Sequence, residues 1–251
     1  MPRTNVVFFG NTGSGKSCLI NMIAGSNAAA TSSGAKGCTF RTNPYHTTIR
    51  GREFTFHDTC GFNEGAQSRT FEDKAIIELY RLLKHLIDGV SLLVYVMKAP
   101  ARIEGNTTTN WKLFNDVLCK RDVPITIVIT GLELEDDMNE WWTKNKQHFK
   151  DAWMNPFNHA CVTTVKGKEK RGFYQFQEEY DQSKRTVEDM IFQSLRPTPW
   201  KMDTIDWLDH MIYQTTMESR KWGAPIERQL IDRCGMSRDD AEKLVKELDA
   251  V

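Results

Sequence analysis

A complete phosphate-loop pattern, G-x-x-x-x-G-K-[ST], occurs near the N-terminus as Gly10-Asn11-Thr12-Gly13-Ser14-Gly15-Lys16-Ser17. Its glycines permit a tight loop whose backbone N–H groups point inward at phosphate oxygens, and the helix that follows adds partial positive charge. We expect Lys16 to neutralise the β- and γ-phosphates of a nucleoside triphosphate, and the hydroxyl of Ser17 to bind Mg²⁺. The predicted nucleotide-binding residues of this loop are consecutive: Asn11, Thr12, Gly13, Ser14, Gly15, Lys16, Ser17 and Cys18.

Two further segments have the residue types that bind the metal ion and the terminal phosphate. Asp58-Thr59-Cys60-Gly61 fits the pattern D-x-x-G. Asp58 would hold the shell of the Mg²⁺ ion through water, and the N–H of Gly61 would meet the γ-phosphate. Thr39 lies in a polar loop between the first predicted helix and a hairpin, where a threonine can bind Mg²⁺ with its hydroxyl and the γ-phosphate with its N–H. Three other threonines remain alternatives for this role: Thr31, Thr42 and Thr47.

A third segment predicts which base is bound. Thr130-Gly131-Leu132-Glu133 follows an apolar strand at the place where GTPases carry N/T-K-x-D. The carboxylate of Glu133 can accept hydrogen bonds from N1–H and the 2-amino group of guanine, a pair of donors that adenine lacks. Gly131 stands where a lysine normally packs over the ring. We expect Thr130, Gly131 and Glu133 to contact the base and to favour guanine, with residues 161–164 as a weaker candidate for the last base-contacting loop.

Alternating strand and helix patterns must position these segments. Apolar runs of strand length lie at 6–9, 45–50, 53–57, 91–97, 125–129 and 160–165. Segments of helical period lie at 16–24, 71–86, 110–118, 137–149 and 187–195. This alternation predicts an α/β fold with a mostly parallel sheet, one antiparallel hairpin strand and helices on both faces. Together with the phosphate-loop, D-x-x-G and base-loop motifs, it fits the fold of a P-loop NTPase G domain.

The segment Arg196-Pro197-Thr198-Pro199 interrupts the alternation, and we place a domain boundary there. Residues 1–196 would form the G domain, and residues 197–251 a C-terminal helical extension with helices near 203–221, 225–234 and 238–249. Ser237 fits a helix N-cap, with Asp240 at position N3. Short helices of this kind need a surface to dock on. That surface is either the G domain itself, or a partner bound when the nucleotide state releases the extension.

Charge, cysteine spacing and apolar runs limit the kinds of binding partner and the cellular compartment that we expect. Acidic and basic residues number 33 each, so the overall charge gives no reason to expect a nucleic acid. The six cysteines lack the spacing of zinc ligands and indicate free thiols in a reducing compartment. The longest apolar run, at 92–97, is too short to span a bilayer, and no signal peptide is recognised. We therefore expect a cytoplasmic protein, for which peripheral membrane contact stays open.

The order of these motifs resembles the translation-factor class of P-loop GTPases. Within that class, the chain is similar to the septin-like branch that holds the immunity-associated nucleotide-binding (GIMAP-type) proteins and the chloroplast import receptors. The residues that carry this likeness are Leu19-Ile20-Asn21, Gly37-Cys38-Thr39 and the box Ala101-Arg102-Ile103-Glu104. The likeness covers about residues 4–195, and a fungal member of the branch would fit. It implies a GTP/GDP switch with Mg²⁺ that forms a homodimer or oligomer through its nucleotide face, with Arg102 acting across the interface.

Hydrolysis is expected to be slow in the isolated chain. In Ras-like enzymes a glutamine directly after D-x-x-G orients the attacking water, whereas Phe62 stands there in this chain. The predicted catalytic residues are Lys16, Thr39, Gly61 and Arg102. Two other functions remain: a scaffold whose assembly is gated by GTP without hydrolysis, and an ATP-using P-loop enzyme. The sequence does not identify a protein effector.

Overall fold

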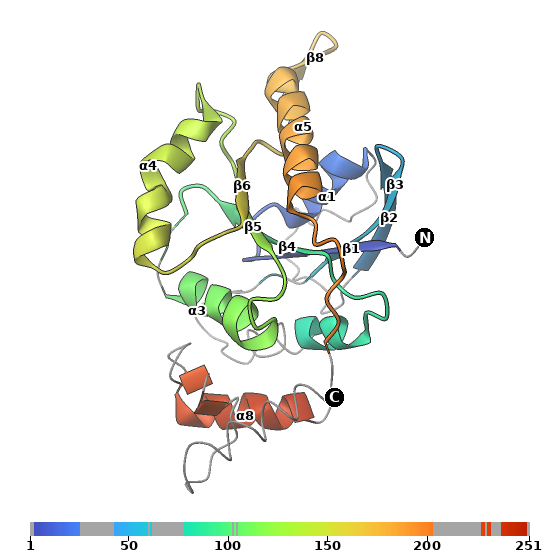
Figure 1. Ribbon diagram of the computed structural model, residues 1–251. Coiled ribbons are helices and arrows are strands. Elements are labelled where there is room, and N and C mark those ends of the chain that lie inside the picture. Colours follow the sequence, from blue (N-terminus) through green and yellow to red (C-terminus); the bar gives the residue numbers. More distant parts are fainter. Residues whose placement is uncertain are drawn as a thin grey trace, which may run out of the picture.

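One mixed sheet forms the centre of the molecule in the computed structural model (Figure 1). The structure describes residues 3–25, 43–59, 61, 78–101, 103, 105–202, 227–228, 230–231 and 237–249. Within this part of the chain, the sheet has the strand order β2-β3-β1-β4-β5-β6. Its strands are β1 (Thr4–Phe9), β2 (Asn43–Ile49), β3 (Arg52–Asp58), β4 (Leu92–Lys98), β5 (Ile125–Thr130) and β6 (Asn158–Cys161). Only β2 runs antiparallel to its neighbour, and the other pairings are parallel. The predicted fold class is therefore confirmed.

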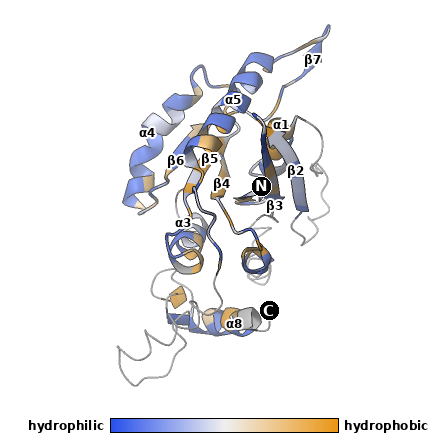
Figure 2. Ribbon diagram, turned by 45° about the vertical axis from the view of Figure 1, so that its right-hand side comes forward, coloured by the Kyte–Doolittle hydropathy of each residue, from blue (hydrophilic) through white to orange (hydrophobic). Residues whose placement is uncertain are grey.

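Both faces of the sheet are covered by apolar clusters, because side chains alternate along each strand. Val6 and Phe8 of β1 face a cluster formed with α1 (Lys16–Ala24) and α5 (Gln177–Ser194). Val7 and Phe9 face a second cluster on the opposite side, which includes residues of α3 (Asn106–Lys112) and of the π-helical turn η1 (Leu113–Leu118). The outward faces of α4 (Met138–Asp151) and α5 are largely hydrophilic (Figure 2).

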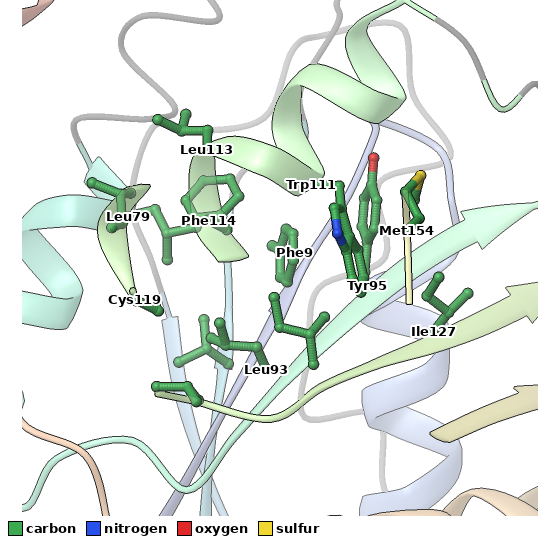
Figure 3. Close-up of a cluster of buried hydrophobic side chains, with 14 of the residues drawn as sticks. Phe9, Leu79, Leu93, Tyr95, Trp111, Leu113, Phe114, Cys119, Ile127 and Met154 are labelled. Carbon is green, nitrogen blue, oxygen red and sulfur yellow. The ribbon is translucent and has the colours of Figure 1, made fainter. Parts of the chain in front are cut away.

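Aromatic side chains fill the second cluster and fix α3 against β1 and β4. Phe9 stacks on Tyr95 with ring centroids 4.8 Å apart, and it lies 4.9 Å from the ring of Phe114 (Figure 3). Trp111 is buried beside Tyr95, at a centroid distance of 6.4 Å. β1 leads into the phosphate loop, and β4 lies between β1 and β5, the strand that leads into the base loop. This packing therefore helps to fix the strands that carry the two loops.

The last described helix, α8 (Arg238–Asp249), contributes to the same cluster. Ala241 and Leu244 of this helix are buried there together with Leu230. As the sequence predicts, Ser237 caps the helix, since its Oγ accepts the N–H of Asp240 at 3.2 Å. The described part of the C-terminal segment is thus docked. The domain boundary at 196/197 stays a prediction.

The region after β6 departs from the expected pattern. β6 ends at Cys161 rather than at 165, and α5 begins at Gln177 rather than at 187. Between them lies a small hairpin of β7 (Glu169–Lys170) and β8 (Phe173–Tyr174). Strands of only two residues are too short to show an alternating pattern, and the charged first turns of α5 have no apolar period, so sequence patterns do not reveal either of them.

Two other helices differ in their extent. α3 begins at Asn106 instead of 110, because its first turns are rich in threonine and asparagine and carry no apolar period. The expected helix over 71–86 is seen over residues 78–85, and its earlier part lies outside the described residues. In the described ranges no helix is both long and apolar enough to cross a membrane.

Candidate nucleotide-binding site

The phosphate loop passes very close to β4 where it leaves β1. Gly10 has φ 144°, and a Cβ at this position would lie 2.1 Å from the carbonyl oxygen of Val96. No residue other than glycine can make this approach. The loop is closed by a hydrogen bond from the N–H of Ser14 to the carbonyl of Asn11, at 3.1 Å. α1 then begins at Lys16 after Gly15, which adopts φ 91°.

Lys16 folds back over the loop that precedes it. Its Nζ donates to the carbonyl of Gly10 at 3.1 Å and to that of Asn11 at 3.0 Å, and the residue is 7 % exposed. The ammonium is therefore held at the mouth of the loop, where the motif predicts the β- and γ-phosphates. Two further polar atoms of the loop, Asn11 Oδ1 and Ser14 Oγ, are buried without a hydrogen-bond partner among the described residues.

Ser17 and Asp58 come together from two separate motifs. The Ser17 hydroxyl donates to Asp58 Oδ2 at 2.6 Å, while Asp58 Oδ1 is buried without a partner in the described ranges. Burial raises the pKa of the Asp58 carboxyl, and the hydrogen bond from Ser17 and the charge of Lys16 act in the opposite direction. The Ser17 hydroxyl and the two carboxylate oxygens of Asp58 are hard oxygen donors of the kind that Mg²⁺ prefers. Ser17 and Asp58 therefore fit the ion.

Gly61 lies directly against the phosphate loop. A Cβ on Gly61 would be 2.4 Å from Thr12 Oγ1 and 2.5 Å from both the Cα and the N of Thr12. Contact this close with another backbone requires a glycine. The preceding Thr59 is fixed to β1, because its Oγ1 donates to the carbonyl of Phe8 at 2.8 Å.

Thr130 holds the phosphate loop through its side chain. Its Oγ1 donates to the carbonyl of Ser14 at 2.7 Å, with a longer contact of 3.3 Å to the carbonyl of Met97. The hydroxyl is buried, and it also lies 3.3 Å from the position of a Cβ on Gly15. Of the three predicted base residues, Thr130 therefore directs its hydroxyl at the loop. The structure links the end of β5 to the phosphate site by this bond.

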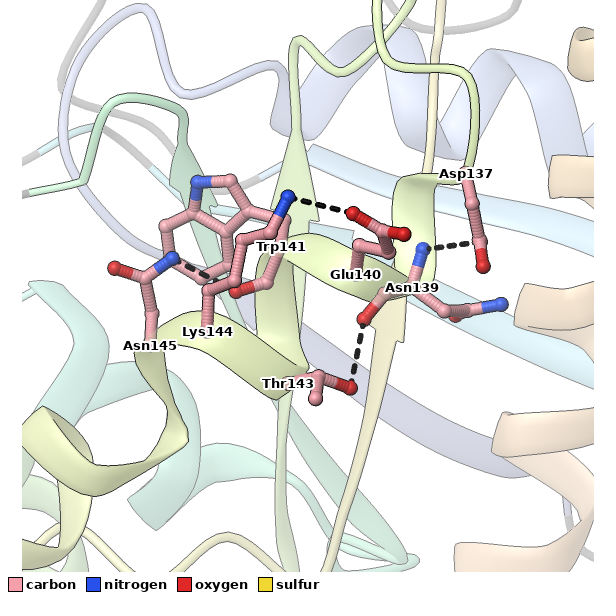
Figure 4. Close-up of polar contacts among 7 residues, drawn as sticks. All are labelled: Asp137, Asn139, Glu140, Trp141, Thr143, Lys144 and Asn145. Carbon is pink, nitrogen blue, oxygen red and sulfur yellow. Dashed lines mark hydrogen bonds and ion pairs between the residues drawn. The ribbon is translucent and has the colours of Figure 1, made fainter.

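Glu133 meets the loop that follows β6. Thr163 Oγ1 lies 3.4 Å from Glu133 Oε2 and donates to it, while the N–H of Thr163 donates to Ser183 Oγ at 3.0 Å. The segment containing Glu133 is followed by α4, whose first turn is fixed by Asp137: its carboxylate accepts the N–H of Asn139 at 2.9 Å (Figure 4). Two loops that the sequence suggested separately as base contacts are thus brought into contact.

Further side chains of α4 form contacts within the helix. Glu140 and Lys144 form an ion pair of 2.6 Å one turn apart, and Asn145 donates to the carbonyl of Trp141 at 2.7 Å (Figure 4). Trp141 and Trp142 pack against the second cluster, and Trp142 stacks on His159 at 4.2 Å. The two tryptophans therefore position α4 against the rest of the domain.

A cavity of about 610 Å³ lies beside the site, between α1 and the start of α5. Cys18 and Thr164 line it on the side of the phosphate loop, and Lys166 lies over the rings of two tyrosines on the other side. Its Nζ is 5.0 Å from the ring centroid of Tyr180 and 5.4 Å from that of Tyr174. No sequence motif indicates this arrangement, because the residues of α1 are far along the chain from the other lining residues, which all fall between 164 and 184.

Three predicted residues cannot be placed. Thr39, Arg102 and Phe62 lie outside the described residues, as do two of the alternative threonines, Thr31 and Thr42. The remaining alternative, Thr47, pairs with Phe54 in the middle of the β2–β3 hairpin, whereas Asp58 pairs with Asn43 at its end. Thr47 is four residue steps along the strand from Asn43, a distance of about 13 Å. Thr47 is therefore not at the metal site.

A match to a family of known proteins agrees with this geometry. The sequence model of the 50S ribosome-binding GTPases matches residues 5–131, which is half of the chain. The chain belongs to this GTPase family. The matched segment contains the phosphate loop, Asp58 and Gly61, and it ends at Gly131 in the base loop. A search of curated proteins finds no match.

Solved structures of GTPases share the fold. Era in complex with MgGDPNP and nucleotides 1506–1542 of 16S ribosomal RNA aligns with a TM-score of 0.56 and 15 % identity, over 81 % of this chain and 60 % of the Era chain. Era from Aquifex aeolicus bound to GDP.AlF4- gives 0.56 and 16 %, over 82 % and 61 %. A structure of the chloroplast translocon components atToc33 and psToc159 gives 0.53 and 13 %, over 75 % and 83 %. The chain thus spans about 60 % of the length of the Era chains.

Proposed function

We propose that this GTPase-family chain is a GTP-binding switch that holds GTP or GDP with Mg²⁺. The observation that carries the proposal is the convergence of three groups at one edge of the sheet. Lys16 covers the phosphate loop, Ser17 is bonded to Asp58, and Gly61 touches Thr12. Ser17 and Asp58 would hold the Mg²⁺ ion, which would offset the negative charge of the phosphates. Lys16 would bind the same phosphates, and Gly61 would distinguish GTP from GDP.

Guanine selectivity is assigned to Glu133. Its carboxylate belongs to the last residue of the base motif and accepts a hydrogen bond of 3.4 Å from Thr163 Oγ1. It would accept two further hydrogen bonds from guanine. We expect Glu133→Ala to weaken GTP binding at least about tenfold and to leave ATP binding nearly unchanged, since hydrogen bonds to a charged group are worth about 1.5–3 kcal/mol each. Competition of a labelled GTP analogue by unlabelled GTP and ATP measures both affinities.

A matched control for this variant is Glu135→Ala, because Glu135 is an exposed glutamate two residues further along the same loop. It should leave both affinities at the wild-type level. An equal loss of GTP and ATP affinity in Glu133→Ala would refute the base assignment. Wild-type protein in which ATP competes as well as GTP would favour the alternative of an ATP-using enzyme, which Gly131 in place of the usual lysine leaves open.

The proposal includes slow hydrolysis that is stimulated by self-association. Phe62 offers no hydrogen bond to an attacking water, and the box containing Arg102 resembles that of the septin-like branch. For atToc33 and psToc159, dimerization is described as important for GTPase activity. We expect the single-turnover rate per molecule to rise with protein concentration and Arg102→Ala to abolish the rise, since an arginine finger is worth about 10³–10⁵ in rate.

The rival in this case is a scaffold that binds GTP without hydrolysing it. Phe62 favours that function, and the same assay separates the two. A rate that is measurable but independent of concentration, and unchanged in Arg102→Ala, would rule out stimulation by self-association. No hydrolysis at any concentration, with GTP still bound, would leave the GTP-gated scaffold.

A further inference from the structure

Gly131 leaves the base loop without the lysine that packs over the ring in related motifs, and a second lysine occupies the space beside it. Lys98 is the last residue of β4 and pairs in parallel register with Thr130, the last residue of β5. A Cβ on Gly131 would lie 3.2 Å from Lys98 Cγ and 3.3 Å from Lys98 Cε. The aliphatic stem of Lys98 therefore runs directly over the Cα of Gly131.

The two residues are matched to each other. Gly131 has φ +80°, a conformation that residues with side chains rarely adopt, and any side chain there would meet the stem of Lys98. Lys98 in turn is exposed, and no hydrogen bond or ion pair of its ammonium is found among the described residues. Its stem is thus fixed on one side by Gly131 and open on the other.

Lys98 lies at the edge of the sheet where the phosphate loop is held. Its register partner Thr130 donates its hydroxyl to the carbonyl of Ser14 in that loop at 2.7 Å. The same hydroxyl lies 3.3 Å from the position of a Cβ on Gly15. The stem crosses from the end of β4, over the end of β5, at the edge of the sheet that holds Lys16 and Glu133.

We propose that Lys98 supplies from β4 what position 131 lacks: its aliphatic stem packs against one face of the purine of the bound nucleotide. This inference rests on the proposed nucleotide binding and identifies a further residue of that site. Long cationic side chains cover apolar surfaces with their stems while the charged end stays in water. A cation near an aromatic face is also attracted by the ring quadrupole.

Lys98 and Glu133 would then have separable roles. Packing against a ring face does not depend on which groups the ring carries at its edge, because every base has a π-face. Lys98 should support GTP, GDP and ATP to a similar degree, whereas Glu133 should act on guanine alone. Affinity would thus depend on Lys98 at the end of β4, and guanine selectivity on Glu133 in the loop after β5.

The first test is the Lys98→Ala variant, with affinities measured by competition against a labelled GTP analogue. We expect GTP and ATP to bind about tenfold more weakly, with the ratio of the two affinities unchanged. Lys98→Met keeps an apolar stem and should stay within about threefold of wild type. The matched control is Lys201→Ala, because the Cγ of Lys201 lies 3.0 Å from a Cβ on Gly89, a glycine of φ +72° beside the opposite end of β4.

The second test restores a lysine at the position that lacks one. In the wild-type background Gly131→Lys would collide with the Lys98 stem and should weaken GTP binding. In the Lys98→Ala background the collision is removed while the backbone strain at φ +80° remains, so the same substitution should weaken GTP binding much less than it does in the wild-type background. Such a dependence on residue 98 in a double-mutant cycle is not produced by backbone strain or by a general loss of stability.

The two tests distinguish a failure of the role of Lys98 from a failure of the proposed nucleotide binding. Wild-type protein that does not bind GTP would refute the nucleotide site as a whole, and the role of Lys98 with it. Wild-type protein that binds GTP, together with Lys98→Ala of equal affinity, would overturn the role of Lys98 alone. It would also be overturned if Gly131→Lys were equally harmful in both backgrounds while thermal unfolding showed all variants to be folded.

Discussion

Lys16→Ala should reduce GTP affinity at least about a hundredfold while the protein stays folded. A hydrogen bond to a charged group is worth about 1.5–3 kcal/mol, and two such bonds to the β- and γ-phosphates exceed the 2.7 kcal/mol of a hundredfold change. The side chain contacts the loop carbonyls of Gly10 and Asn11 through its ammonium. Its removal therefore affects the loop far more than the core. Titration with a labelled GTP analogue measures the affinity, and thermal unfolding checks the fold.

Lys184→Ala is the matched control for this variant. Lys184 extends from α5 to the opposite end of α1, where its Nζ lies 3.6 Å from the position of a Cβ on Gly25. The Lys184→Ala variant removes a lysine that lies next to α1 but away from the phosphate loop. Its GTP affinity should therefore remain close to that of wild type. If Lys16→Ala bound GTP as tightly as wild type, the phosphate loop would not be the binding site.

The phosphate loop could be predicted because it is a local pattern. Eight consecutive residues fix its chemistry, and the flanking apolar run and helical period fix its place between a strand and a helix. Ser17 and Asp58 are each predicted as metal-binding residues from their own motifs, whereas the hydrogen bond between them comes from the structure. The structure adds the close approach of Gly10 to Val96, which explains why the loop begins with a glycine.

The base loop could be predicted only in part, because its contacts come from several strands. The sequence places Thr130 among the base residues, yet its hydroxyl is bonded to Ser14 of the phosphate loop. Gly131 indicates that a lysine is missing, but no pattern reveals that Lys98, 33 residues earlier, lies over the gap. Such relations depend on the register of β4 against β5, which periodicity alone does not supply.

Gly61→Ala should weaken binding of a non-hydrolysable GTP analogue at least about tenfold more than binding of GDP. The added Cβ would lie 2.5 Å from the backbone N and Cα of Thr12, which cannot shift without deforming the phosphate loop. The backbone of residue 61 would have to withdraw instead. Its N–H could then no longer reach a γ-phosphate, and a charge-assisted hydrogen bond worth about 1.5–3 kcal/mol would be lost. GDP lacks that phosphate and should be less affected.

Gly51→Ala separates this effect from the general cost of replacing a glycine. Gly51 lies in the turn between β2 and β3 with φ +79°, and a Cβ there would meet nothing within 4 Å. That variant should be destabilised by backbone strain while its preference for GTP analogue over GDP stays at the wild-type level. Equal losses for both nucleotides in Gly61→Ala would mean that residue 61 acts by distorting the loop. Unchanged affinities for both would mean that Gly61 does not contact the nucleotide. Only a selective loss for the GTP analogue assigns to Gly61 the sensing of the γ-phosphate, on which a GTP/GDP switch depends.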